Sequence, residues 1–222
     1  MQTVHTYKPV CPSYRLYNME KGYVCQRCLG GSYRHAVAER CHKNSLWASM
    51  LVAGEMYLHR AMKFNTEYID LFHVPSRFMG EKLRQGGIPA HKIQHLFYTI
   101  NLDDYSPRYS DDGYFLYYGR LSAEKGIATL LRAVRDIPGK YHLKIVGRGP
   151  QEQELQHIAG EAGCTVEFTG ALSGENLKKT VQGAQFIVVP SEWYDNSPLV
   201  IYESLAMGKP IIGSRSGGIS EL

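Results

Sequence analysis

The chain has 222 residues, of which 44% are hydrophobic and 21% are charged, and its formal net charge is +4 at pH 7. This length suffices for one large domain or two small ones, and the composition excludes disordered and fibrous proteins. The positive charge is concentrated in residues 1–64, where Lys and Arg far outnumber Glu and Asp is absent. Such a region suits contact with an anionic substrate, a membrane surface or nucleic acid, and it is equally compatible with a solvated basic face.

The first 43 residues are predicted to be a loop-rich segment, because they hold four of the five cysteines and few aliphatic side chains. Residues 1–13 contain no apolar run of the kind that forms the core of a signal peptide, so none is expected there. His5, in the run Thr3–Tyr7, follows the expected end of a strand. A single histidine is usually structural or exposed, and its place at a strand end is the one local reason to consider a functional role.

Four cysteines in this segment have a spacing that favours a metal site. Cys11, Cys25, Cys28 and Cys41 form a C-x13-C-x2-C-x12-C array. A C-x2-C pair with two further cysteines can hold a tetrahedral structural zinc ion. Two other interpretations stay open, namely unlinked thiols and a redox or disulfide cluster, which the lack of a secretion signal disfavours. Cys164, by contrast, begins an expected strand and is predicted to be a small buried hydrophobic residue.

The pattern of residues 44–104 predicts a less regular α/β arrangement with a long amphipathic helix at its start. The most apolar part of that helix, Leu46–Met62, is too short and too interrupted by charge to span a bilayer. Asp, Ser and Pro cluster in a linker near residues 103–112. We expect residues 1–104 to form a partial N-terminal α/β domain with a Cys-rich loop region at residues 8–43. Its expected elements are a helix at Ser45–Phe64, a strand at Asp70–Val74, a helix from Pro75-Ser76 to Gly86-Gly87 and a strand at Ile93–Phe97.

From Tyr114 onward the pattern alternates regularly between strand and helix. Short Gly-containing loops between these units predict a parallel, doubly wound sheet over residues 113–222. The expected strands are Tyr114–Tyr118, Leu143–Val146, Thr165–Phe168, Phe186–Val189 and Pro210–Ile212. Two clean helical stripes, each burying one helix face, are Ile127, Leu130, Leu131 and Val134, and then Leu155, Ile158, Ala159 and Ala162. Two further helical patterns are Leu177, Val181 and Ala184, and then Leu199 to Met207.

The loops after the first two strands of this pattern are candidates for ligand contact, because ligands of doubly wound sheets bind beyond the carboxyl ends of strands. Arg120 and Lys125 lie in the first loop, where two cations beside a helix start could hold a diphosphate. An ordinary charged surface loop is the alternative for this pair. The second loop, Gly147–Pro150, lacks the third glycine of a dinucleotide fingerprint, so a dehydrogenase is not expected. A close backbone approach to a ligand remains compatible with its glycines.

The run from Pro190 to Glu203 is the most informative part of the chain. A strand stops at Pro190, and Ser197-Pro198 is predicted to open a helix, with Ser197 as N-cap and Pro198 as first helical residue. Free amides and the helix dipole there suit an anion. Asp195 before the helix and Glu203 within it would suit the hydroxyl groups of a nucleotide sugar. Asp195 could equally be a structural carboxylate that the dipole stabilises, whereas Glu203, in an apolar helix, requires a polar partner.

Taken together, Gly119-Arg120 with Lys125-Gly126, Gly147 with Gly149-Pro150, and the run Asp195–Pro210 resemble the donor domain of glycosyltransferase family four, the glycosyl transferases group 1. That family has the two-domain GT-B fold and retains the anomeric configuration. The region from His5 through the four cysteines to Pro75-Ser76 is similar to a bacterial subgroup that modifies surface polysaccharides. By comparison with the family pattern, which begins with a glycine-rich strand–loop–helix and ends with further helices, we expect this chain to be a fragment.

The resemblance implies a role for each matching residue. Arg120 and Lys125 would bind the donor diphosphate, and Glu203 would bind the ribose. Asp195 stands where the family usually has the first glutamate of an E-x7-E pattern, and His5 matches a histidine that faces the transferred sugar. The implied catalytic residues are thus Arg120, Lys125, Asp195 and His5. The backbone of residues 168–172 would hold the nucleotide base, and that of residues 197–199 would bind phosphate. The implied donor-binding residues are Gly119, Gly147, Phe168, Gly170, Leu172, Ser197, Pro198, Leu199 and Glu203.

The expected protein is a retaining glycosyltransferase that moves a hexose from a UDP- or GDP-sugar to a polysaccharide or lipid-linked acceptor. No catalytic metal is expected, because cations and a helix terminus would neutralise the phosphates. We expect a cytoplasmic location, with peripheral contact at the inner face of the plasma membrane left open, and no nucleic-acid partner, because the aromatic residues are not interleaved with basic clusters. The alternatives are a truncated nucleotide-binding module without transferase activity and a zinc-stabilised interaction protein.

Overall fold

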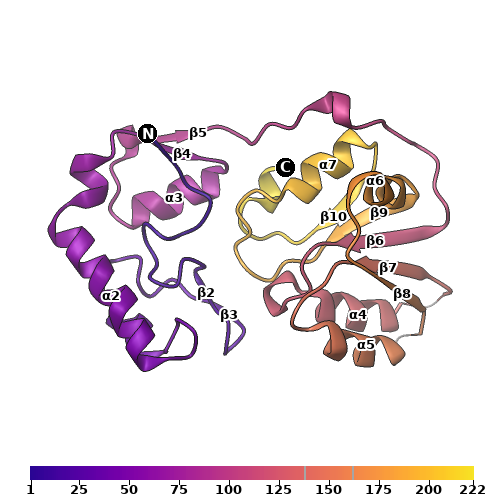
Figure 1. The fold of residues 1–222 in the computed structure, drawn as a ribbon, viewed down its shortest axis with the longest axis horizontal. Coiled ribbons are helices and arrows are strands. Elements are labelled where there is room, and N and C mark those ends of the chain that lie inside the picture. Colours follow the sequence, from indigo (N-terminus) through magenta and orange to yellow (C-terminus); the bar gives the residue numbers. More distant parts are fainter. Residues whose placement is uncertain (138, 162) are drawn as a thin grey trace. The chain divides into compact units, whose positions relative to one another are not determined.

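The computed structural model describes residues 1–137, 139–161 and 163–222. The chain forms two compact units. Unit 1 comprises Met1–Tyr98, Trp193–Ser197 and Ser216–Leu222, and unit 2 comprises Thr99–Glu192 and Pro198–Arg215. Figure 1 labels the helices and strands of both units.

Unit 2 is built on a five-stranded parallel sheet with the strand order β10-β9-β6-β7-β8. Parallel neighbours require crossover connections, which here contain helices, and the order changes direction between β9 and β6. This confirms the expected doubly wound α/β pattern. Each expected strand is present, with bounds within two residues of those predicted. The strands are β6 (Tyr114–Tyr118), β7 (His142–Val146), β8 (Thr165–Gly170), β9 (Ala184–Val189) and β10 (Ile211–Gly213).

Four α-helices cover the two faces of this sheet, α4 and α5 on one side and α6 and α7 on the other (Figure 1). The first predicted stripe is buried along its whole length on α4 and packs in the core of unit 2. Ala162, the last position of the second stripe, lies outside the described residues. Ala184 was expected in a helix and instead begins β9, because α6 ends at Gly183 and Ala184 pairs with Tyr114. The helices are α4 (Ile127–Arg135), α5 (Glu152–Gly160), α6 (Gly174–Gln182) and α7 (Leu199–Ala206).

Unit 1 contains a three-stranded parallel sheet with the order β1-β4-β5, formed by β1 (Gln2–Thr3), β4 (Phe72–Val74) and β5 (Ile93–His95). Between β4 and β5 lies α3 (Arg77–Gln85), which begins at the N-cap Ser76. The Ser76 hydroxyl accepts a hydrogen bond from the Met79 amide (3.1 Å). The core beneath these elements includes Val4, Tyr7, Leu16, Phe72, Val74, Met79 and Leu83.

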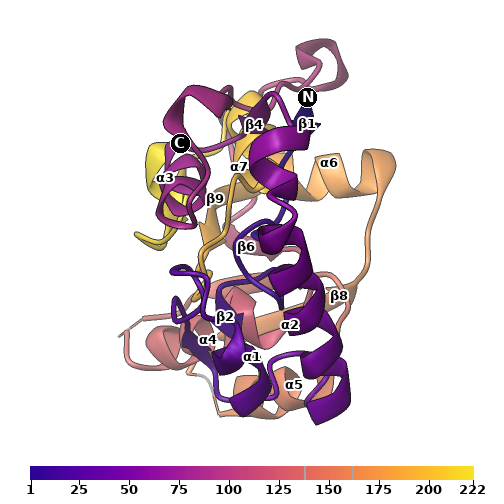
Figure 2. The same ribbon diagram turned by 90° about the vertical axis from the view of Figure 1, so that its left-hand side faces the viewer.

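The region of residues 8–43 has little regular structure, as predicted. It contains a two-stranded antiparallel hairpin, β2 (Tyr17–Asn18) with β3 (Tyr23–Val24), and the five-residue helix α1 (Arg34–Ala38). Figure 2 shows α1 beside the long helix α2 (Leu46–Ala61), against which it packs. The predicted extension of α2 to Phe64 is wrong, because Lys63 adopts a left-handed backbone (φ 50°) and a short π-helix follows at Phe64–Tyr68.

Two segments from the second half of the chain complete unit 1. The amide of Gly218 donates to the carbonyl oxygen of Asp195 (2.8 Å). Gly217 has a φ of 60°, and a Cβ there would lie 2.2 Å from the same carbonyl oxygen, so a side chain would prevent this contact. The carboxylate of Glu221 accepts from the amides of Arg77 (2.7 Å) and Phe78 (2.6 Å) at the start of α3. The last residues of the chain therefore cap a helix more than a hundred positions earlier.

In the part of the chain that the structure describes, no helix combines the length and apolar character needed to cross a bilayer.

Candidate functional site

The loops that follow β6, β7 and β8 line an open pocket of about 350 Å³ in unit 2. This edge of the sheet is where a doubly wound fold binds ligands. Two exposed guanidinium groups, those of Arg120 and Arg148, line the pocket. The lining residues are Tyr118, Gly119, Arg120, Val146, Gly147, Arg148, Ala171, Leu172 and Leu177. Four of the residues implied by the resemblance, Gly119, Arg120, Gly147 and Leu172, are thus brought together, and Arg148 is a cation that the sequence reasoning missed.

The glycines of these loops let one backbone approach another. A Cβ on Gly147, whose φ is 141°, would lie 1.9 Å from the carbonyl oxygen of Gly119, and a Cβ on Gly149 would lie 2.1 Å from that of Leu121. The Leu121 amide in turn donates to the carbonyl of Arg148 (3.0 Å). The close backbone approach that the sequence suggested for a ligand is therefore made to the neighbouring loop. The loops after β6 and β7 pack together, and Arg120 belongs to the first of them.

Lys125 ends a 3-10 helix, Ala123–Lys125, that leads from the loop of Arg120 into α4. Its amide donates to the carbonyl of Ser122 (3.0 Å), and its side chain is half-buried. The next residue, Gly126, has a φ of 69°, and a Cβ there would lie 2.1 Å from the carbonyl of Pro190. The loop after β9 therefore packs directly on the start of α4. Lys125 is not among the residues that line the pocket in unit 2.

Residues 168–172, which are implied to hold the base, lie partly at the pocket and partly in the core. Leu172 lines the pocket, whereas the Phe168 side chain packs against the core of unit 2. Gly170, with a φ of 72°, accepts the amide of Gly147 at its carbonyl oxygen (2.8 Å). That hydrogen bond ties the end of β8 to the loop after β7, so the backbone here is fixed before any ligand arrives.

Glu203 on α7 has the polar partners that its sequence context required. Its carboxylate lies 3.4 Å from the hydroxyl of the buried Tyr118, and it also accepts a hydrogen bond from Tyr105. Burial raises the pKa of Glu203, and the hydrogen bonds from Tyr118 and Tyr105 oppose that rise. No local sequence signal marks Tyr105, which lies in the segment before β6.

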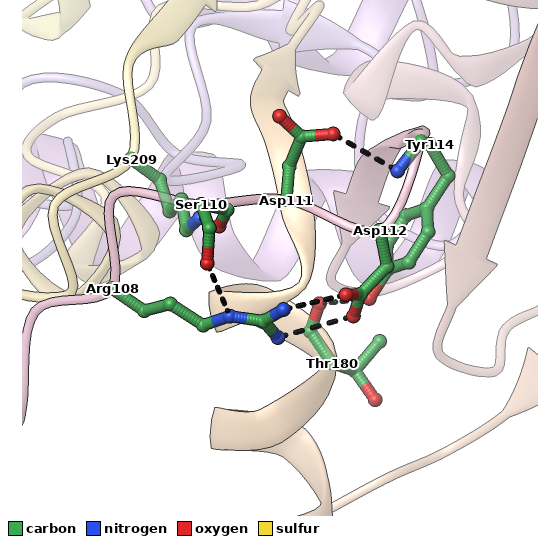
Figure 3. Close-up of polar contacts among 8 residues, drawn as sticks. Arg108, Ser110, Asp111, Asp112, Tyr114, Thr180 and Lys209 are labelled. Atoms are coloured by element: carbon green, nitrogen blue, oxygen red, sulfur yellow. Dashed lines mark hydrogen bonds and ion pairs between the residues drawn. The ribbon is translucent and has the colours of Figure 1, made fainter.

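The segment that carries Tyr105 is fastened to unit 2 by charged side chains (Figure 3). The guanidinium of Arg108 forms two hydrogen bonds with the Asp112 carboxylate (2.6 and 3.1 Å). Lys209, which is only 3% exposed, donates to the carbonyl of Ser110 (2.8 Å), and its burial lowers its pKa. The Arg108 amide also donates to the carbonyl of Met207 (3.0 Å), just after α7. This bracing holds the segment beside the helix that bears Glu203.

The start of α7 differs from the prediction. The helix begins at Leu199 and its N-cap is Pro198, which has the extended ψ of 122° and offers no side-chain acceptor. Ser197 is therefore not the N-cap, and Pro198 is not the first helical residue. The first amides of α7 consequently receive no hydrogen bond from a capping side chain.

A second pocket, of about 140 Å³, lies within unit 1. Its lining brings together His5, Asp195 and Ser197, three of the residues implied by the resemblance. His5 stands two residues beyond β1, as expected, and its Nδ1 lies 2.6 Å from the hydroxyl of Tyr98. The lining residues are His5, Thr6, Tyr7, Tyr14, Tyr98, Trp193, Tyr194, Asp195, Asn196 and Ser197.

The Asp195-Asn196 loop is fixed within unit 1 by buried hydrogen bonds. The Asn196 amide oxygen accepts from the Ser76 hydroxyl (2.7 Å), and its amide nitrogen donates to the Val4 carbonyl (3.4 Å). Asp195 itself is only 7% exposed. Burial, followed by the nearby charge of Asp195, raises the pKa of Tyr7 far above its usual value. Asn196 and Ser76 are therefore positioning residues that the sequence reasoning did not single out.

The two pockets leave several implied residues outside their linings. Unit 1 gathers His5, Asp195 and Ser197, and unit 2 gathers Gly119, Arg120, Gly147 and Leu172. The residues that line neither of these two pockets are Lys125, Phe168, Gly170, Pro198, Leu199 and Glu203.

The four cysteines of the predicted zinc site line one small cavity in unit 1, together with Pro12, Ser13, Tyr17 and Ala36. All four are free thiols. Within residues 1–137, 139–161 and 163–222, no three His, Cys, Asp or Glu side chains stand close enough to hold a metal ion as they are arranged. Zinc therefore stays a prediction. Cys164 is half-buried and packs against the core of unit 2.

Comparison with known proteins identifies the family. The family model for glycosyl transferases group 1 matches residues 101–222, more than half of the chain and nearly all of unit 2. The chain belongs to the glycosyl transferases group 1. The expected family is thereby confirmed.

Curated group 1 relatives match parts of the chain at moderate identity. The sulfoquinovosyl transferase SQD2 of Arabidopsis thaliana is 27% identical over 75% of this chain and 33% of its own length. The GDP-mannose-dependent alpha-mannosyltransferase of Corynebacterium glutamicum is 39% identical over 48% of this chain and 24% of its own length. The chain thus spans about a third of the length of such relatives, or less.

Solved structures support the GT-B fold. The structure of Anabaena Alr3699/HepE in complex with UDP-glucose matches with a TM-score of 0.64 and 17% identity, covering 89% of this chain and 60% of that chain. The lipopolysaccharide outer core galactosyltransferase WaaB matches with a TM-score of 0.60 and 21% identity, covering 68% and 45%. At these identities the likeness concerns the fold alone.

Proposed function

We propose that this protein transfers a hexose from a nucleoside-diphosphate sugar to a glycan or lipid-linked acceptor, with retention of configuration. One observation carries the proposal. The part of the chain that matches the group 1 glycosyl transferases contains a pocket at the carboxyl ends of β6, β7 and β8, lined by Arg120 and by the glycine loops. A guanidinium over a glycine-walled backbone surface is chemistry that suits a diphosphate.

Arg120 and Lys125 are proposed to neutralise the diphosphate as it leaves the sugar. Gly119 and Gly147 line the pocket beside Arg120, and their close packing fixes the backbone against which a phosphate would lie. Charge stabilisation by fixed cations of this kind is a large contribution to group transfer. In this proposal no metal ion takes part in the transfer step, and residues 113–222 form the nucleotide-sugar-binding domain.

Recognition of the rest of the donor is proposed residue by residue. Glu203, held by two tyrosine hydroxyls, would accept hydrogen bonds from the ribose. The amides of Ser197 and Leu199, on either side of Pro198, which has no N–H, would bind phosphate, since the start of α7 lacks a side-chain cap. The backbone of residues 168–172 would lie beside the base. Asp195 and His5, which line one pocket, would recognise the transferred sugar.

The donor is proposed to be a UDP- or GDP-sugar. Two similar proteins support this range, namely the Anabaena protein solved in complex with UDP-glucose and the Corynebacterium mannosyltransferase named for GDP-mannose. The acceptor is proposed to be a polysaccharide or a lipid-linked glycan, since relatives are named for lipopolysaccharide and amylovoran synthesis. The proposal includes a cytoplasmic location and contact of the basic residues 1–64 with an anionic membrane surface, which cosedimentation with anionic vesicles would detect.

The test combines nucleotide binding with turnover. We expect calorimetric titration of the chain to show binding of UDP or GDP, and Arg120→Ala to weaken that binding about 10- to 100-fold, because a charge-assisted hydrogen bond contributes about 1.5–3 kcal/mol. Lys125→Ala should abolish transfer while the fold is kept, as judged by circular dichroism. The matched controls are Arg132→Ala on α4 and Lys179→Ala on α6, both exposed.

Each outcome separates the proposal from its rivals. Transfer at the unaltered rate in Lys125→Ala would remove the assigned role of this residue. Nucleotide binding without turnover by the chain would indicate a binding module. Failure to bind either nucleotide would contradict the proposed function.

A further inference from the structure

The cysteine-lined cavity of unit 1 is a second candidate site, and it lies among residues that the proposed transfer does not use. Its four thiols come from separate positions of an irregular segment: Cys11 precedes β2, Cys25 and Cys28 follow β3, and Cys41 follows α1. The cavity is closed on its remaining sides by Pro12, Ser13, Tyr17 and Ala36.

All four cysteines line the same small cavity, and Cys41 packs against the small cluster of buried side chains that includes Cys28. Cys11 and Cys28 are buried, and Cys25 and Cys41 are half-buried. A divalent cation that prefers sulfur would therefore find four possible ligands around one point.

The segment around the cavity has too little regular structure and too small a core to be stable by itself. Residues 8–43 contain strands of two residues and one five-residue helix, and their own cluster of buried side chains is small. Four non-glycine residues here, and a fifth just after residue 43, adopt a left-handed backbone, which is unfavourable by about 1 kcal/mol or more each. They are Tyr14, Leu16, Arg40, Lys43 and Asn44, and most lie within a few positions of Cys11 or Cys41. Segments of this kind are commonly stabilised by a metal ion, whose binding free energy becomes folding free energy.

We propose that the cavity binds one structural Zn²⁺ through the thiolates of Cys11, Cys25, Cys28 and Cys41. As the side chains stand, the sulfurs surround the cavity without closing into a ligand group among the described residues, so binding requires them to turn inward about their Cα–Cβ bonds. Four cysteine thiols lose their protons to solvent as four Zn–S bonds of about 2.3 Å form. The ion acts on the fold of residues 8–43 and takes no part in sugar transfer.

The first test is the metal content of the full chain, purified without a metal-binding tag from zinc-containing medium. We expect about one zinc per chain by mass spectrometric metal analysis. Replacement by Co²⁺ should give the near-ultraviolet absorption band of thiolate-to-cobalt charge transfer. Cys28→Ser should lose most of the zinc, whereas Cys164→Ser, in unit 2, should keep it.

A second measurement covers the case in which Cys28→Ser does not fold. The unmodified chain is treated with iodoacetamide before and after chelation, and the modified cysteines are counted by mass spectrometry. We expect Cys164 alone to be alkylated in the zinc-loaded chain and all five cysteines after chelation. Zinc well below one per chain with equal alkylation in both states would overturn the proposal, and so would a disulfide between any two of the four. Neither result depends on nucleotide binding or transfer.

Discussion

At the scale of single residues, the carboxylate of Glu203 shows how an acidic side chain is kept in an apolar helix. Burial raises its pKa, and the hydroxyls of Tyr118 and Tyr105 partly compensate. Tyr118 also lies within hydrogen-bonding distance of Val200 and Ser204, so its single proton is shared among several acceptors. The ionised carboxylate is thus tolerated in the folded state at a free-energy penalty that a structural role alone would not require.

This arrangement predicts a pH-dependent gain in stability for Glu203→Gln. For a carboxyl group whose folded pKa is raised, the folded state loses stability as pH rises above the group's usual pKa, because the charged form is disfavoured on folding. The variant should therefore melt a few degrees higher than the unaltered chain at pH 8, and at the same temperature at pH 4. Thermal melts at the two pH values measure this difference.

The companion variant Tyr105→Phe sharpens the interpretation. Removing the Tyr105 hydroxyl should increase the free-energy penalty of burying the ionised Glu203 carboxylate, and so lower the melting temperature at pH 8. The double variant, with Tyr105→Phe and Glu203→Gln, should melt at the same temperature as Glu203→Gln. Equal melting temperatures for Glu203→Gln and the parent at pH 8, with equal nucleotide affinity, would contradict the account of this carboxylate.

At the scale of elements, the loops after β6 and β7 depend on glycine for their packing. The backbones of Gly147 and Gly119 are so close that a Cβ on Gly147 would overlap a carbonyl oxygen that cannot move independently of β6. The Gly147 amide is also tied to β8 through Gly170. A side chain at this position would separate three strand ends at the edge where the pocket lies.

We therefore predict that Gly147→Ala destabilises unit 2 by about 2–4 kcal/mol, from the overlap and from a φ that alanine rarely adopts. Gly160→Ala is the matched control, because a Cβ there meets open space at the end of α5. The control should be neutral or more stable by up to about 1 kcal/mol. Chemical denaturation of both variants measures this difference in stability. Similar denaturation midpoints for the two would show that the close approach of the loops is not required.

At the scale of the whole molecule, unit 1 is assembled from three separate stretches of the chain. Its helix α3 is capped both by the adjacent Ser76 and by Glu221, from the far end of the sequence. A carboxylate that accepts two first-turn amides satisfies donors that would otherwise lack an intrahelical partner, and it also complements the helix dipole.

Glu221→Ala should therefore destabilise unit 1 by about 1 kcal/mol. Hydrogen exchange should become faster in the first turn of α3 and remain unchanged in α5 of unit 2. Glu67→Ala, an exposed glutamate of unit 1, is the control and should leave both rates as they are. Unchanged exchange in α3 of Glu221→Ala would mean that the carboxylate does not act as a cap in solution.

The sequence by itself determined the α/β class, the strands and helices of unit 2 and the family. These follow from local causes: the run Tyr114–Tyr118 is apolar throughout because the strand is buried on both faces, and the stripe on α4 has helical spacing because one face meets the core. The need for a polar partner at Glu203 was also readable, since a carboxylate in an apolar helix cannot be buried alone.

Only the tertiary structure decided which groups meet. Tyr105 reaches Glu203 because Arg108 and Lys209 brace its segment, and Glu221 reaches α3 because Gly217 and Gly218 pack on the Asp195-Asn196 loop. The structure also decided that α7 begins at Leu199, one residue later than predicted, because Pro198 is extended. The spacing of the four cysteines indicated a cluster, and the structure showed that they line one cavity. Such contacts join residues far apart in sequence, and hydrophobic periodicity and capping signals, which act over a few residues, carry no information about them.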